Sequence, residues 1–237
     1  RFLTTPAPEF KLIETMLWQP GSGYWLLDLH LDRLTESAGY FSYPLDLDKI
    51  KAGLHGLAEK FSSNVPLKNQ RVRLTLSKRG ELEFSHSELP EGVLPEIKLG
   101  NILKKRELGV LPKVIFSEKK TDSQSSYLFH KTTHRKLYDD ERSQAAAKGF
   151  YEVLFVNEKN EVTEGCYTNI FLQKEGKLLT PPVSCGLLPG VLRNHLLRQY
   201  PGLVEETVLT RKDMKQADSV YVGNSVRGLV QVQLVNS

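Results

Sequence analysis

A short basic segment in the middle of the chain carries the most reactive side-chain types. Residues 129–135 read Phe-His-Lys-Thr-Thr-His-Arg, so that cationic and imidazole side chains surround Lys131. A lysine becomes a nucleophile when burial and neighbouring cations lower the pKa of its amine. On spacing alone, a solvated basic loop is the more common reading of such a segment, and both interpretations stay open. His130 and His134 lack a nearby carboxylate or thiol as a third ligand, so no metal site is predicted.

Two turn-forming segments in the second half of the chain could bind an anion. Residues 187–192 read Leu-Leu-Pro-Gly-Val-Leu and lead into a predicted helix, whose first N–H groups and dipole attract phosphate. Gly223-Asn224-Ser225 follows a predicted strand and offers backbone N–H groups and a hydroxyl. Taken alone, each segment is also typical of an ordinary helix start or hairpin turn.

The composition favours a folded enzyme with small-molecule ligands. The 237 residues are 40% hydrophobic and 25% charged, which fits one large domain or two modest ones. The net charge is only +4, and basic and acidic residues are interspersed, so a nucleic-acid-binding surface is not expected. No apolar run approaches the roughly 18 residues of a membrane span, and the N-terminus has no signal-peptide pattern.

The two cysteines, Cys166 and Cys185, have neither the spacing of a zinc site nor the number needed to crosslink a chain of this length. We therefore expect reduced thiols, no metal and a cytoplasmic location.

In the first half of the chain, hydrophobic periodicity predicts the strands and helices that would position the candidate site residues. We expect two strands, then two helices, then two more strands, followed by an irregular connection over residues 85–96. The expected strands are residues 10–18, 24–29, 71–77 and 81–84, and the expected helices are residues 29–38 and 48–61.

The second half begins with the clearest linker candidate, the polar stretch 117–127. It divides the chain into a small N-terminal domain, residues 1–116, and a larger C-terminal domain, residues 128–237. In the larger domain we expect several strands and two helices. The strands are residues 152–156, 169–172, 178–180, 219–222 and 229–234, and the helices are residues 139–148 and 191–200.

The order of these segments resembles that of the class IV pyridoxal-phosphate enzymes, which share fold type IV. The most specific match is residues 162–171, Val-Thr-Glu-Gly-Cys-Tyr-Thr-Asn-Ile-Phe, to a Glu-Gly-x-x-x-Asn-Ile/Leu-Phe signature. Residues 13–15 resemble an early Phe-Glu-Thr strand, and residues 30–34 a His-x-x-Arg-Leu helix. Residues 188–191 match a Leu-Pro-Gly-Ile/Val segment, and Lys131 falls where the family has its cofactor-binding lysine.

This resemblance implies an α+β fold of two domains, the small one α/β and the larger one mainly β with helices. It implies pyridoxal 5'-phosphate as cofactor and a homodimer as the assembly. Lys131 would bind the cofactor covalently and then act as the general base, and Glu164 would face the pyridine nitrogen. The remaining implied cofactor-binding groups, most of them around the phosphate, are Arg33, the backbone N–H groups of Val191 and Leu192, Asn224 and Ser225.

Within the family, the chain most resembles the aminodeoxychorismate lyase module often fused behind aminodeoxychorismate synthase component I. The similar segments are residues 10–18, 130–133 and 224–230. The chain departs from the pattern at residues 6–9, where Pro-Ala-Pro-Glu replaces a Gly-Asp-Gly run, and at Gln231, often a proline.

A lyase of this kind eliminates pyruvate from 4-amino-4-deoxychorismate and forms 4-aminobenzoate for folate biosynthesis. Fusion to or association with the synthase is the implied partnership. The substrate is a dicarboxylate, so cationic side chains should line its pocket. The candidates are Thr15, Arg73, Arg79 and Arg227, together with Arg71, although a surface location is more common for Arg71 and Arg73 on one strand face.

Two other functions remain open. A branched-chain or D-amino-acid aminotransferase would use the same Lys131 and Glu164, but would need a keto-acid acceptor. A degenerate domain that only binds a protein partner is the third reading, and retention of both residues argues against it.

Overall fold

The computed structural model describes residues 9–64, 66–90, 100 and 109–235. By its internal contacts the chain divides into two compact units. The first unit is Arg1–Leu89 together with Lys131–Arg135, and the second is Pro90–His130 together with Lys136–Ser237.

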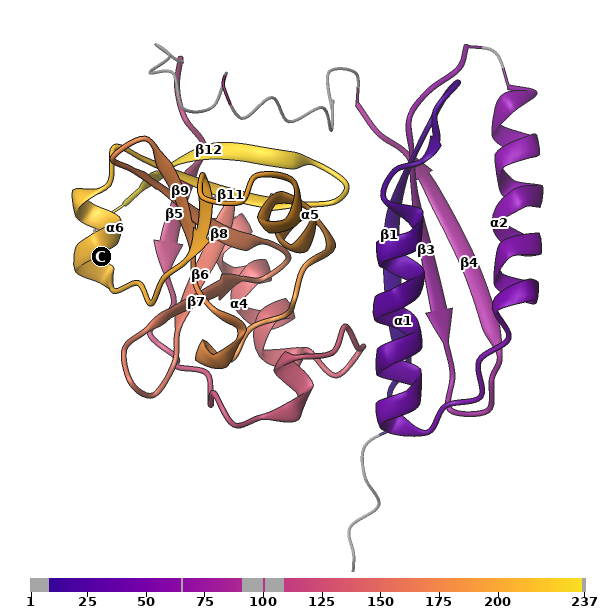
Figure 1. Ribbon diagram of the computed structural model, residues 1–237, viewed down its shortest axis with the longest axis horizontal. Helices are drawn as coiled ribbons and strands as arrows, with labels where there is room; N and C mark the ends of the chain where they lie inside the picture. Colours follow the sequence, from indigo (N-terminus) through magenta and orange to yellow (C-terminus); the bar gives the residue numbers. More distant parts are fainter. Residues whose placement is uncertain (1–8, 65, 91–99, 101–108, 236–237) are drawn as a thin grey trace, which may run out of the picture. The chain divides into compact units, whose positions relative to one another are not determined.

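The first unit is a four-stranded antiparallel sheet with two helices, α1 and α2 (Figure 1). The strands follow the order β2-β1-β3-β4. The elements are β1 (Leu12–Gln19), β2 (Gly23–Tyr24), α1 (Leu27–Phe41), α2 (Leu47–Ser62), β3 (Gln70–Leu76) and β4 (Leu82–Glu88).

Alternation along β1 and β3 decides which side chains face the helices. In the register of these strands Glu14 pairs with Leu74 and Thr15 pairs with Arg73. The apolar residues of Glu14's parity form the core with both helices, and they include Leu12, Met16, Trp18, Val72, Leu74 and Leu76. Glu14 is therefore a carboxylate on the core-facing side of the sheet.

The expected strand over residues 24–29 is wrong beyond Tyr24. The chain turns at Leu26, which has a left-handed φ of 56°, and α1 begins at Leu27. A short apolar run without alternation does not distinguish a strand from the first turn of a helix.

The second unit is a mixed eight-stranded sheet with helices around it (Figure 1). The strand order is β10-β9-β8-β11-β12-β5-β6-β7. The strands are β5 (Lys113–Phe116), β6 (Glu152–Val156), β7 (Val162–Gly165), β8 (Asn169–Lys174), β9 (Lys177–Thr180), β10 (Val204–Glu206), β11 (Ser219–Asn224) and β12 (Gly228–Leu234). The helices are α4 (Lys136–Ala147), α5 (Val191–Gln199) and α6 (Arg211–Gln216), with short 3-10 turns at Ser126–Leu128 and Val183–Cys185.

This sheet closes on itself because β7 pairs with β8 as well as with β6. Closure gives a barrel-like unit whose interior is filled by apolar side chains, among them Leu154, Ile170, Leu172 and Val222. The predicted fold class, α+β with a small α/β unit and a larger, mainly β unit, is confirmed.

The division between the units differs from the expected one. Residues 113–116 were assigned to the first domain, but as β5 they pair with β6 and β12 of the large sheet. The polar stretch 117–127 is bonded to the same unit, since Ser117 N–H donates to Leu154 O at 2.8 Å and Thr121 N–H to Val156 O at 3.0 Å. Part of the irregular connection expected at 85–96 is strand β4, and residues 91–96 lie outside the described residues.

The described residues contain neither a membrane-spanning helix nor a cluster of metal ligands. None of their helices is long and apolar enough to cross a membrane. No group of three or more His, Cys, Asp or Glu side chains among them could hold a metal ion.

Candidate functional site

Within the first unit, Lys131 lies beside the start of β1. Ile13 N–H donates to the Lys131 carbonyl at 2.8 Å, and Thr133 N–H donates to the Lys11 carbonyl at 2.9 Å. These bonds extend the sheet edge at the end of β1 that β2 leaves uncovered. The basic segment is therefore anchored to a strand and is not a freely solvated loop.

The amine of Lys131 has the properties of a reactive lysine. Burial, followed by the charges of Arg33 and Arg135, lowers its pKa to about 7. No hydrogen bond or ion pair holds its Nζ atom among the described residues. Near neutral pH a substantial fraction of this amine is uncharged, which is the form that attacks a carbonyl group.

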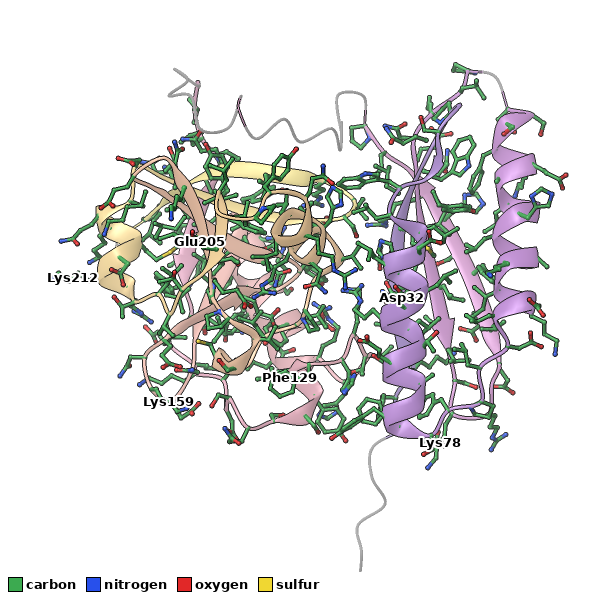
Figure 2. All side chains as sticks on the ribbon, viewed as in Figure 1. Asp32, Lys78, Phe129, Lys159, Glu205 and Lys212 are labelled. Atoms are coloured by element: carbon green, nitrogen blue, oxygen red, sulfur yellow. The ribbon has the colours of Figure 1, made fainter. Side chains whose placement is uncertain are left out.

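A buried carboxylate fixes Arg33 on α1. Arg33 donates from Nε to Glu14 Oε1 at 2.9 Å and from Nη2 to Glu14 Oε2 at 2.7 Å. Burial alone would raise the pKa of Glu14, but Arg33 and His30 outweigh it and lower the pKa to about 2. The bidentate pair leaves Nη1 of Arg33 without a hydrogen bond among the described residues, so that it is available to an anion. The neighbouring Asp32 points away from the core and is labelled in Figure 2.

His30 completes this cluster. Its Nδ1 lies 2.6 Å from Glu14 Oε2, and burial lowers the pKa of the imidazole despite the carboxylate. A neutral ring that donates from Nδ1 leaves Nε2 as a buried acceptor, and this atom has no partner in the described part of the chain.

The candidate substrate residues of the first unit fall in different places. Thr15 and Arg73 are directly opposite each other on β1 and β3, on the parity that does not enter the core of this unit. Arg79 is exposed in the turn between β3 and β4, a turn marked in Figure 2 by the label of Lys78. Arg71 is exposed on the same face as Arg73, two residues before it.

Within the second unit, Glu164 projects from β7 and is nearly buried, at 7% exposure. Its Oε1 accepts from the Tyr138 hydroxyl at 2.9 Å, and its Oε2 accepts from Leu188 N–H at 3.1 Å. Both oxygens are thereby oriented by donors from α4 and from the segment before α5. A carboxylate held in this way suits a protonated ring nitrogen.

The segment before α5 is shaped around Asn169. Asn169 Nδ2 donates to the Leu188 carbonyl at 2.9 Å, and a Cβ atom on Gly190 would lie 1.8 Å from Asn169 Oδ1. Glycine is therefore required at position 190. α5 begins directly after it with no side-chain cap, so the N–H groups of Val191 and Leu192 are open to a ligand.

The second predicted phosphate loop lies against the first turn of α5. A Cβ atom on Gly223 would lie 3.0 Å from Leu192 Cδ2, which shows how closely β11 approaches the helix. Asn224 Oδ1 accepts from the backbone N–H groups of Val226 and Arg227, both at 3.0 Å, and these bonds shape the turn around the buried Ser225. The structure thus brings together the two segments that the sequence separately predicted to bind an anion.

Arg227 is exposed at the end of this turn. Its Nη1 donates to the Tyr151 hydroxyl at 3.2 Å, and the guanidinium lies 5.7 Å from the Tyr151 ring centroid. This contact orients Arg227 against its own unit.

The partners of the key side chains are not predicted by the sequence motifs. An acidic residue at a core position of an alternating strand is a signal for a buried ion pair, and Glu14 carries that signal. Tyr138 carries none, because a tyrosine on an amphipathic helix is usually a packing residue.

Comparisons with known proteins place these residues in a family. The family described as Amino-transferase class IV matches residues 11–235. The crystal structure of a Mesorhizobium loti protein assigned as an amino-acid aminotransferase is 35% identical and covers 95% of this chain and 100% of its own, with a TM-score of 0.80.

Curated relatives are named for both of the activities weighed above. A Thermotoga maritima protein assigned as a branched-chain-amino-acid aminotransferase is 28% identical over 87% of this chain and 71% of its own. A Schizosaccharomyces pombe protein assigned as an aminodeoxychorismate lyase is 27% identical over 96% of this chain and 90% of its own. The match to the Escherichia coli branched-chain-amino-acid aminotransferase spans only 31% of that enzyme, at 30% identity.

Proposed function

Because the chain belongs to the class IV aminotransferase family of pyridoxal-phosphate enzymes, we propose that it is a 4-amino-4-deoxychorismate lyase that releases 4-aminobenzoate and pyruvate. The observation that carries the proposal is the concentration of guanidinium groups near the Lys131 amine. Arg33, Arg135 and Arg73 all contribute to its lowered pKa. Two of these cations, Arg73 and Arg135, are not assigned to the cofactor phosphate, and they suit a substrate with two carboxylates.

The residues fit the cofactor of the family. The unpartnered amine of Lys131 suits covalent attachment to an aldehyde, and the oriented carboxylate of Glu164 suits a pyridine nitrogen. The open N–H groups of Val191 and Leu192, with Asn224 and Ser225 beside them, suit the phosphate. Arg33 is the candidate side-chain cation for that phosphate.

Each residue has a role in the proposed reaction. Bound pyridoxal phosphate supplies an electron sink for the carbon that carries the substrate amine. Lys131 removes the proton from that carbon, because its pKa of about 7 makes the amine a base at physiological pH. Glu164 keeps a proton on the ring nitrogen through its anionic oxygens. The guanidinium of Arg73, opposite Thr15, is a candidate for a substrate carboxylate.

Elimination needs only one substrate. The enolpyruvyl ether of aminodeoxychorismate places a leaving group next to the activated carbon, so its loss is intramolecular and the ring becomes aromatic. The similarity to the S. pombe relative over nearly the full length of both chains supports this choice. Association with, or fusion to, the synthase that makes the substrate is part of the proposal.

An aminotransferase is the second candidate function. The Mesorhizobium loti structure, at 35% identity, favours it. Such an enzyme would use the same lysine and carboxylate, but would return the proton to the cofactor and release a keto acid.

One assay separates the two candidates. The purified protein with pyridoxal phosphate is given aminodeoxychorismate in one reaction and branched-chain or D-amino acids with 2-oxoglutarate in the other. We expect 4-aminobenzoate, by its fluorescence, and an equal amount of pyruvate, by a coupled dehydrogenase. Glutamate formation without 4-aminobenzoate would replace the lyase proposal with the aminotransferase. If neither product forms, a binding domain is favoured.

Lys131→Ala should abolish product formation while the circular dichroism spectrum stays that of the wild type. Lys136→Ala is the matched control, because Lys136 is an exposed lysine whose ammonium pairs with Asp140 on the surface of α4. It should retain full activity.

A further inference from the structure

Glu152, at the first position of β6, is a buried carboxylate outside the proposed chemistry. It is 2% exposed, and its hydrogen bonds within the described part of the chain come from uncharged donors. Its two oxygens accept four hydrogen bonds, from the N–H groups of Val153 (3.0 Å), Cys166 (3.2 Å) and Tyr167 (3.3 Å) and from the Thr168 hydroxyl (3.1 Å). Burying a carboxylate costs free energy, which these hydrogen bonds offset, and the same bonds fix the positions of the donors.

Three of the four donors belong to one loop, residues 166–168, which joins β7 to β8. The fold makes room for the carboxylate at Gly165, where a Cβ atom would lie 2.9 Å from Glu152 Cγ and 2.4 Å from the Thr168 hydroxyl. Glu152 and Gly165 therefore form one packed unit that sets the conformation of this loop.

Each end of the loop leads into the segment before α5. Glu164 precedes the loop by two residues and Asn169 follows it, and the two are partners in the β7–β8 ladder. Glu164 accepts from the N–H of Leu188, and Asn169 donates to its carbonyl. The backbone N–H and the carbonyl of Leu188 are thus both held by the β7–β8 hairpin, whose loop is hydrogen-bonded to Glu152.

The middle of the loop reaches the second phosphate segment. The Tyr167 carbonyl accepts from Asn224 Nδ2 at 3.1 Å, while the N–H of the same residue donates to Glu152. Asn224 in turn shapes the turn around Ser225. The loop therefore connects the carboxylate of Glu164 with both of the segments proposed to bind phosphate.

From these contacts we infer that Glu152 is a positioning residue for the cofactor, which holds Glu164, the start of α5 and the Asn224–Ser225 turn in one alignment. The inference rests on the cofactor-binding roles proposed above and is independent of whether the reaction is elimination or transamination. When Glu152 is altered, the affinity for the cofactor should fall whatever the substrate is. The loss should be larger for pyridoxal phosphate than for pyridoxal, which lacks the phosphate.

Glu152→Gln tests this inference in the full-length chain stripped of cofactor. The amide NH2 would face the N–H of Tyr167, so that the loop loses its set position while side-chain volume is kept. Titration with pyridoxal phosphate and with pyridoxal, followed by protein fluorescence, gives two apparent Kd values. We expect the Kd for pyridoxal phosphate to rise at least tenfold and the preference for the phosphorylated form to shrink.

Glu158→Gln is the matched control. Glu158 also holds a loop of the second unit, through the N–H of Ser123 at 2.9 Å and its hydroxyl at 2.6 Å, but this loop carries none of the proposed cofactor groups. Its loss should affect the melting temperature alone. The same result for Glu152→Gln, a lower melting temperature with unchanged Kd values and an unchanged preference, would overturn the inference.

Thr168→Val keeps the test decisive if Glu152→Gln does not fold. It removes only the hydroxyl bond to Glu152 and preserves the shape of a buried side chain. We expect a rise of about two- to fivefold in the Kd for pyridoxal phosphate, again with a smaller preference over pyridoxal. Wild-type values for both ligands would contradict the inference. Neither measurement uses aminodeoxychorismate, so failure of the lyase proposal would leave this result unaffected.

Discussion

At the scale of single residues, the proposed attachment of the cofactor to Lys131 predicts how the rate of attachment depends on pH. Only the neutral amine attacks an aldehyde, so the attachment rate should rise with pH through a midpoint near the pKa of about 7. Stopped-flow absorbance after mixing the stripped protein with pyridoxal phosphate measures this rate. Arg135→Gln removes a nearby cation, which should raise the pKa and move the midpoint upward. A midpoint near that of a free lysine, 10.5, would contradict the buried setting of Lys131.

The Glu14 carboxylate sets a second residue-scale prediction, on acid stability. Its pKa is lowered from 4.5 to about 2 in the folded protein, so it stabilises the fold above pH 4.5 and loses this contribution as pH falls toward 2. The shift corresponds to about 3 kcal/mol at neutral pH. Urea unfolding should give Glu14→Gln a lower free energy of unfolding at pH 7 and a weaker pH dependence between pH 4.5 and 2. Parallel wild-type and variant curves would argue against the buried pair with Arg33.

At the scale of elements, Gly190 is the position where α5 depends on a neighbouring strand. In Gly190→Ala the new Cβ atom would lie 1.8 Å from Asn169 Oδ1, so the asparagine must move and its bond to the Leu188 carbonyl breaks. We expect the first turn of α5 to shift and the Kd for pyridoxal phosphate to rise at least tenfold. Gly56→Ala, in α2, has nothing within 4 Å of its new Cβ atom, and should keep the affinity and gain up to about 1 kcal/mol. Equal affinities in the two variants would contradict the role given to Gly190.

The helices and strands also show which parts of the fold could be predicted from the sequence. Local signals placed α2 within a residue or two, because Asp46 caps it and its apolar residues recur on one face. The strand β5 was not predicted. Its partners β6 and β12 are parallel to it and distant in the chain, so no hairpin turn in the sequence indicates the pairing. α6 was missed although Thr210 and Asp213 form a capping box that could have been read. Of the candidate site, the motifs supplied Lys131, but the pairing of Glu14 with Arg33 needed the fold.

At the scale of the whole molecule, the family places the chain among pyridoxal-phosphate enzymes, but a shared scaffold does not decide the reaction. The relatives with full-length similarity include both assigned activities. We expect the difference between them to lie in the residues proposed to contact the substrate, for which Arg73, Arg79 and Arg227 are the candidates, rather than in Lys131 or Glu164.

The assembly gives the last prediction. The resemblance to the class IV enzymes implies a homodimer, and a two-fold pair is the commonest closed oligomer. Light scattering of the cofactor-loaded protein at micromolar concentration should give twice the 26.9 kDa of one chain. If small-domain segments of each subunit complete the neighbouring site, activity per chain should fall on dilution in step with the fraction of dimer, and return on reconcentration. A monomer mass with full activity at the same concentration would show that one chain is sufficient.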